Sequence, residues 1–103
     1  MQIIPVLDVP NQTFGVTLGG QVCNINLYEN LNGLFCDLYV NNALIIGGVI
    51  CENLNRIVRD LYLGFIGDLI WQDTQGTSNP SSPGLGTRYL FCYLTAADLD
   101  GMG

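Results

Sequence analysis

Residues 14–25 read FGVTLGGQVCNI and contain the strongest local fold signal in this 103-residue chain. Apolar residues alternate with small or polar ones on both sides of the glycine pair 19–20, which is the period-two pattern of β-strands. Two adjacent glycines suit a two-residue hairpin turn, because such turns need positive φ angles. Folding the chain there places the apolar side chains on one face, in a register that pairs Leu18 with Gln21, Val16 with Cys23 and Phe14 with Ile25.

Alternating segments continue on both sides of this hairpin. Asn41 and Asn42 mark a second tight turn, because asparagine tolerates the left-handed region. The glycine pair at 47–48 interrupts an apolar segment and predicts a bulge. We expect a mainly β fold, a small antiparallel β-barrel or sandwich of about six to seven strands. Besides the hairpin, the predicted strands cover residues 3–7, 34–40, 43–50, 68–72 and 88–94.

The period changes near residues 53–62. Leu54, Ile57, Val58 and Leu61 follow helical spacing, and this predicts one short helix or helical turn. We interpret it as a segment that closes one end of the strand assembly. A partner-binding amphipathic helix is the alternative.

Two segments are predicted to lie outside the regular structure. Residues 74–86 are rich in Gly, Ser and Pro and predict an exposed loop, with Leu85 as the one residue suited to the core. Residues 95–103 predict a flexible C-terminal tail. A single β-rich domain is therefore expected over residues 1–94.

The composition excludes several classes of function. Charged residues make up 12% of the chain, about half the usual share, while 49% is hydrophobic. Three arginines and no lysine, within a net charge of -6, argue against direct nucleic-acid recognition. No uncharged apolar stretch is long enough to predict a membrane span.

The missing residue types also argue against catalysis. Without histidine or lysine there is no Ser-His-Asp triad, Cys-His pair or Schiff base. Asp73 opens an Asp-Thr-Gln-Gly sequence, which we interpret as a turn at the end of a strand; an aspartic-protease-like dimer is the alternative. The carboxylates of Asp68, Asp73, Asp98 and Asp100 lack the spacing of a calcium loop. We therefore predict a protein that is not an enzyme, with no catalytic residue, cofactor or metal.

The four cysteines lie in apolar segments rather than in loops. Their spacing offers no Cys-x-x-Cys pair for zinc or thiol exchange. We expect small buried hydrophobic side chains rather than disulfides, at Cys23, Cys36, Cys51 and Cys92.

Two predicted strands, 34–40 and 88–94, have apolar residues on both faces. One small core cannot cover them all, and exposed apolar patches mark interfaces. This pattern predicts a subunit of a larger assembly. The candidate partner-interface residues are Phe35, Tyr39, Trp71, Tyr89, Phe91 and Tyr93.

Several motifs occur along the chain in a distinctive order. They are MQIIP at 1–5, PNQTF at 10–14, GGQ at 19–21, FCDLY at 35–39, YLG at 62–64, GDL at 67–69 and LGTRYL at 85–90. In this order and spacing, over residues 1–94, the sequence resembles the cyanophage-type baseplate plug family, small tail proteins of contractile-tailed phages.

The resemblance implies a structural role in the virion. It implies a β-rich subunit of the tail baseplate near the tail axis, associated with the hub and assembled in the cytoplasm of the bacterial host. The expected partners are other tail proteins, namely the hub, tail tube, spike or tape measure. A homo-oligomer, trimer or hexamer, is also expected, with residues 74–86 and 95–103 ordering on assembly. The alternative is a small-ligand-binding β-barrel whose pocket is lined by Trp71 and the tyrosines.

Overall fold

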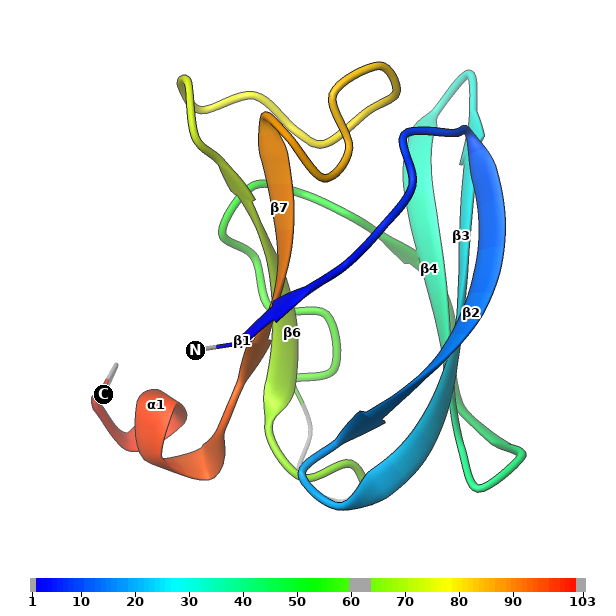
Figure 1. Cartoon of the computed structure of the whole chain (residues 1–103), viewed down its shortest axis with the longest axis vertical. Coiled ribbons are helices and arrows are strands. Elements are labelled where there is room, and N and C mark those ends of the chain that lie inside the picture. The colour runs from blue at the N-terminus through cyan, green and yellow to red at the C-terminus, as the bar shows by residue number, and fades with distance from the viewer. Residues whose placement is uncertain (1, 60–63, 102–103) are drawn as a thin grey trace.

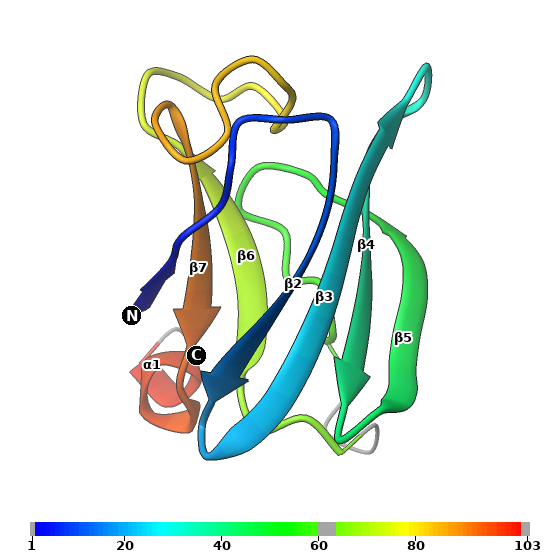
Figure 2. The same cartoon turned by 45° about the vertical axis from the view of Figure 1, so that its right-hand side comes forward.

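A computed structural model describes residues 2–59 and 64–101, and it confirms a mainly β fold built from two antiparallel sheets (Figure 1). One sheet has three strands in the order β1-β7-β6, and the other has four in the order β2-β3-β4-β5. The sheets face each other as a sandwich, and among the described residues they are not joined into a closed barrel (Figure 2). The strands are β1 (Gln2–Ile4), β2 (Asn11–Leu18), β3 (Gln21–Asn30), β4 (Gly33–Val40), β5 (Ala43–Ile50), β6 (Asp68–Asp73) and β7 (Tyr89–Leu94).

The β2–β3 hairpin has the register predicted from its sequence. Leu18 lies opposite Gln21, Val16 opposite Cys23 and Phe14 opposite Ile25. Gly19 and Gly20 form the turn with φ angles of 57° and 79°, so glycine relieves the strain that a side chain would meet there.

The β4–β5 connection is also as predicted. Asn41 and Asn42 have φ angles of 51° and 68° in the turn. Further along β5, the register shifts at the glycine pair 47–48, which lies opposite Asp37. The amide of Gly48 donates a hydrogen bond of 2.7 Å to Oδ1 of Asp37, so this carboxylate holds the bulge in place.

The helix predicted at 53–62 is wrong for residues 53–59, and residues 60–62 lie outside the described part of the chain. Residues 53–57 instead run along the edge of β6, where Leu54 N donates to Trp71 O at 2.8 Å and Ile57 N to Leu69 O at 2.9 Å. Ile57 is buried, so its apolar character serves packing in an irregular segment. The backbone groups at the edge of β6 would otherwise lack partners, and this tertiary pairing outweighs the helical spacing.

The short helix of the structure is α1 (Ala96–Gly101), which lies within the predicted C-terminal tail. Its N-terminus is capped by a reciprocal pair: Asp98 N donates to Thr95 Oγ1 at 3.1 Å, and Thr95 N to Asp98 Oδ2 at 3.0 Å. Leu99 packs against a small cluster on the outer face of the three-stranded sheet, formed by Ile70, Cys92 and Leu94.

The main core fills the space between the sheets. Trp71 of β6 stacks on Phe91 of β7, with ring centroids 4.6 Å apart, and both side chains are fully buried. Leu85 is 1% exposed, as expected of the one apolar anchor in the 74–86 loop. Apolar side chains of both sheets therefore form one continuous core.

Candidate functional site

The outer face of the four-stranded sheet combines half-buried aromatic and polar side chains. Three rows of cross-strand neighbours cross it, from β3 through β4 to β5. The first row is Tyr28, Phe35 and Ile50; the second is Asn26 and Asp37 with the Gly47–Gly48 bulge; the third is Asn24, Tyr39 and Leu44. We call these residues the outer-face strip.

Aromatic and aliphatic groups form the two flanks of the strip. Tyr28 stacks on Phe35, with ring centroids 5.8 Å apart and planes inclined by 17°. Ile50 beside them is 41% exposed, and Leu44 beside Tyr39 is 57% exposed. Each flank therefore presents apolar surface, together with one tyrosine, to solvent.

The central row is a hydrogen-bonded polar network. Thr13 Oγ1 donates to Asn26 Oδ1 at 2.8 Å, and Asn26 Nδ2 donates to Asp37 Oδ2 at 3.4 Å. Oδ1 of Asp37 accepts from the Tyr28 hydroxyl at 3.3 Å and from the bulge. Burial, together with the nearby Asp37 carboxylate, raises the pKa of Tyr28. Asp37 already accepts three hydrogen bonds, but it has no ion-pair partner among the described residues, so a protein that covers this row would have to offset the charge of the carboxylate.

A shallow hollow of about 350 Å³ lies on the same face. Amide and hydroxyl groups dominate its lining, which consists of Thr13, Asn24, Asn26, Tyr39 and Asn42. Such groups can donate and accept hydrogen bonds, but no general acid or base for chemistry near neutral pH stands among them.

The six predicted interface residues fall into two groups. Phe35 and Tyr39 lie half-buried on the outer-face strip. The expectation that Tyr89, Phe91 and Tyr93 share an exposed patch with them is wrong. These three side chains are at most 5% exposed, and they point into the core, as does the fully buried Trp71. The reason is that both faces of β7 are apolar, and its aromatic face packs against the opposite sheet.

Sequence reasoning missed Tyr28, Leu44 and Ile50. Tyr28 has the same strand phase as Asn24 and Asn26, so continuing the alternation of the predicted hairpin along this strand would have placed all three side chains on the face opposite the apolar one. The bulge in β5 shifts the phase along that strand, which obscures the placement of Leu44 and Ile50.

One end of the sandwich is organised around Asp73, in the turn expected there. Its Oδ1 accepts from Arg88 Nε at 2.9 Å and from Gln75 N at 2.9 Å, and its Oδ2 accepts from Arg88 Nη2 and Ser78 N, both at 2.9 Å. The Arg88 hydrogen bonds hold the pKa of this carboxyl well below its usual range. Asp73 is thus a fixed anchor of the 74–86 loop, and its saturated, ionised carboxylate is unsuited to acid catalysis.

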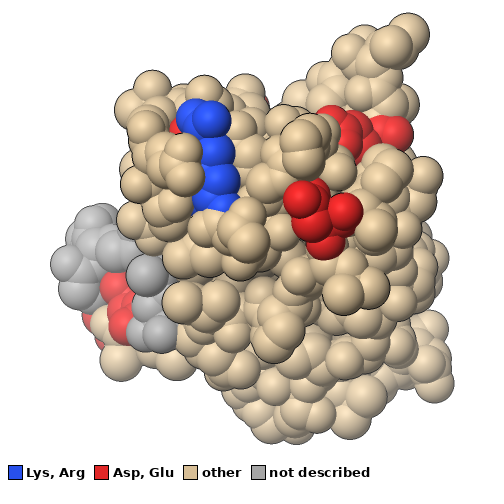
Figure 3. Space-filling model, turned by 45° about the horizontal axis from the view of Figure 1, so that its top comes forward, with Lys and Arg blue, Asp and Glu red and all other residues tan. Residues whose placement is uncertain are grey.

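A second carboxylate ties this loop to the chain before β2. Oδ1 of Asp8 accepts from Gly84 N at 2.9 Å, from Leu85 N at 3.2 Å and from Ser82 Oγ at 3.2 Å. These bonds lower the pKa of Asp8, the one from Gly84 most strongly. Most of the surface seen from this end carries neither basic nor acidic side chains (Figure 3).

The four cysteines are buried and free, so the expectation of small buried side chains is confirmed. Burial raises the pKa of Cys51 to about 12, although the Trp71 indole lowers it in part. The indole N–H of Trp71 lies near this sulfur but has no hydrogen-bond partner among the described residues. Within residues 2–59 and 64–101, no three His, Cys, Asp or Glu side chains are grouped so that they could hold a metal ion.

The stacked tryptophan also bears on the alternative of a ligand-binding barrel. Trp71 is fully buried and packed against Phe91, so it is not available to line an open pocket. Tyr39 is the one tyrosine in the lining of the hollow on the outer-face strip, and Trp71 is not part of that lining.

These features define a small two-sheet β-sandwich with tightly anchored loops and a mixed aromatic and polar strip on one sheet. Among the described residues, no helix has the length and apolar character needed to cross a membrane. A family model described as cyanophage baseplate Pam3 plug gp18 matches residues 1–96. The chain belongs to this baseplate plug family, which makes it a phage tail protein of structural type. A comparison with curated proteins finds no match.

Proposed function

We propose that this protein is a non-catalytic structural subunit of the baseplate, placed near the tail axis beside the hub and joined to other tail proteins by surface packing. The family match over residues 1–96 carries this proposal. The outer-face strip supports it, because its half-exposed aromatic side chains flank a row of polar groups that are hydrogen-bonded to one another, and aromatic side chains of this kind are enriched in protein interfaces.

The proposed assembly includes several copies of the chain in a trimer or hexamer. A ring of this kind needs heterologous contacts, in which different surfaces of neighbouring copies meet. The anchored loops at one end of the sandwich, together with the strip on one sheet, give the subunit distinct surfaces for such contacts.

The strip is tested with a tail-assembly assay. Phe35→Ser and Tyr39→Ser remove an aromatic side chain from each flank, and we expect each to reduce incorporation into tails by about tenfold or more, as for truncated interface anchors. The matched control is Ile3→Ser, an apolar side chain that is 57% exposed on the other sheet. Full incorporation of both strip variants would remove the strip from the proposal.

Light scattering of the purified chain, with and without reductant, tests the oligomer. A trimer or hexamer that ignores reductant agrees with the proposal and with buried thiols. A dimer that dissociates on reduction contradicts it. If the purified chain is a monomer, the proposed oligomer can form only within the tail, and the number of copies in assembled tails then tests the proposal.

A further inference from the structure

The outward edge of β2 differs from the other sheet edges of the molecule. Residues 53–57 form backbone hydrogen bonds with the edge of β6. The edge strand β1 has only three residues, and the edge strand β5 contains a bulge at Gly47–Gly48. By contrast, β2 has eight residues in unbroken register with β3 and contains neither a proline nor a charged residue. Those are the usual protections of an exposed edge, and β2 lacks them.

The free backbone groups along this edge follow from the hairpin register. In an antiparallel pair, residues that exchange hydrogen bonds alternate with residues whose N–H and C=O point away. Glu29 N donates to Pro10 O at 2.9 Å, so even-numbered residues of β2 face β3. Thr13, Gly15 and Thr17 therefore point their backbone groups outward. All three residues are exposed, and their amides and carbonyls have no partner among the described residues.

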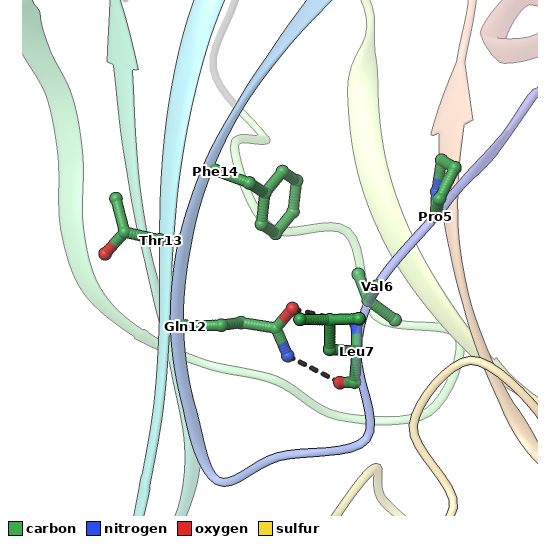
Figure 4. A pocket seen from close by; sticks show the side chains of 6 residues that line it. All are labelled: Pro5, Val6, Leu7, Gln12, Thr13 and Phe14. Atoms are coloured by element: carbon green, nitrogen blue, oxygen red, sulfur yellow. Dashed lines mark hydrogen bonds between the residues drawn. The ribbon is translucent and has the colours of Figure 1, made fainter.

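An apolar cleft lies beside this edge. It has a volume of about 160 Å³ and is lined by Pro5, Val6, Leu7, Gln12, Thr13 and Phe14. Figure 4 shows Phe14 pointing from β2 into the space beside Pro5 and Val6. The Gln12 side chain fixes the opposite wall through its bonds with Leu7 N at 3.0 Å and Leu7 O at 2.7 Å. The cleft is thus preformed, and an inward side chain of an added strand would enter it.

The start of β2 carries uncompensated negative charge. Asp8 and Glu29 both accept hydrogen bonds from Ser82, at 3.2 Å and 3.1 Å, so their carboxylates lie close together. Neither forms an ion pair within residues 2–59 and 64–101. Residues 1–55 contain no Lys or Arg, so no strand of this four-stranded sheet could supply a cation from a second copy. Charge complementarity therefore favours a different protein.

We propose that the edge of β2 binds an extended segment of another tail protein, which adds a strand to the four-stranded sheet. The segment pairs with the backbone of Thr13, Gly15 and Thr17 and inserts an apolar side chain against Phe14. It carries a Lys or Arg next to Asp8 and Glu29. This inference rests on the proposed role as a baseplate subunit and names the kind of partner that the subunit recognises.

Cryo-electron microscopy of assembled tails tests the proposal directly. The expected result is a strand of another protein bonded to β2, with an apolar residue in the cleft and a basic residue beside Asp8. A β2 edge open to solvent, or paired with a second copy of this chain, overturns the inference and leaves the baseplate role intact. Absence of the chain from the baseplate overturns both.

A matched pair of variants tests the same contact in tail assembly. Thr13→Pro removes an outward N–H without breaking a bond to β3, and proline is tolerated where a strand N–H faces solvent. We expect its incorporation into tails to fall at least about tenfold relative to Thr13→Ala, with an unchanged melting temperature. Thr17→Pro replaces it if the melting temperature of Thr13→Pro drops. Equal incorporation of the proline and alanine variants overturns the inference.

Discussion

Gly67, at the entry to β6, offers a sharp test of the packing between the start of β6 and the end of β7. Its φ angle is 101°, and a Cβ atom there would overlap the carbonyl oxygen of Leu94 and lie 2.8 Å from the Tyr93 ring. The Tyr93 hydroxyl donates a hydrogen bond to the carbonyl of Ile66, so the ring cannot withdraw without losing that bond. Gly67→Ala must therefore shift backbone at the end of β7.

Gly20→Ala is the matched control, because it has the backbone strain without the contact. Gly20 has a φ angle of 79°, and a Cβ there would meet no atom within 4 Å. The left-handed conformation costs about 1 kcal/mol in either variant, and overpacking adds about 1–3 kcal/mol at Gly67 alone. We expect Gly67→Ala to lower the free energy of unfolding by about 2 kcal/mol more than Gly20→Ala, roughly a 30-fold difference in the unfolding equilibrium.

Urea unfolding followed by tryptophan fluorescence measures this difference. Trp71 is the single tryptophan and is fully buried, so its signal reports the loss of the core. A shift in midpoint at constant slope gives the change in stability. If the two alanine variants lose the same stability within about 0.5 kcal/mol, the close approach of Gly67 to β7 is refuted.

Three further outcomes follow from the structure. Phe91→Ala should lower the free energy of unfolding by about 3–5 kcal/mol, because it leaves a cavity at a fully buried site. Leu31→Ala, at a side chain that is 106% exposed, should change this free energy by no more than about 0.5 kcal/mol, and calorimetry compares the two variants. The raised pKa of Cys51 and the burial of all four thiols predict that a thiol reagent at pH 8 modifies the native chain far more slowly than the unfolded chain, which absorbance at matched reagent concentrations checks. The pKa of Asp73 is lower in the folded chain than its ordinary value of 3.8, so its contribution to stability is fully present above that pH and is lost as the pH falls further. Arg88→Met should therefore make the melting temperature fall less steeply with decreasing pH. An unchanged dependence on pH would contradict the stabilising role of the Asp73–Arg88 pair.

The local sequence was sufficient to predict strand pairing where the turn residues and the alternation of apolar residues indicate the same register. The Gly19–Gly20 turn and the flanking alternation fixed the β2–β3 register, and Asn41–Asn42 fixed the next turn in the same way. The bulge at Gly47–Gly48 and the burial of Leu85 also followed from residue type. These features depend on backbone conformations and alternation that a few neighbouring residues determine.

The helix was misplaced because two signals competed. The apolar residues of 53–62 have the spacing of a helix, but Ile57 and Val58 are buried in an irregular segment that forms backbone hydrogen bonds with the edge of β6. The helix α1 carries a local signal that went unused, the Thr95–Asp98 capping pair. Spacing of apolar residues shows only that they are buried, and it does not show which backbone bonds accompany the burial.

The sequence by itself determined a mainly β chain, its central hairpin and its membership of the baseplate plug family. Only the tertiary structure decided which aromatic residues are available to a partner. Both faces of β7 are apolar, so alternation could not show that Tyr89, Phe91 and Tyr93 point inward while Phe35 and Tyr39 remain on the outer-face strip. The choice depends on which face meets the opposite sheet, and that contact joins residues far apart in the chain, beyond the reach of any local pattern.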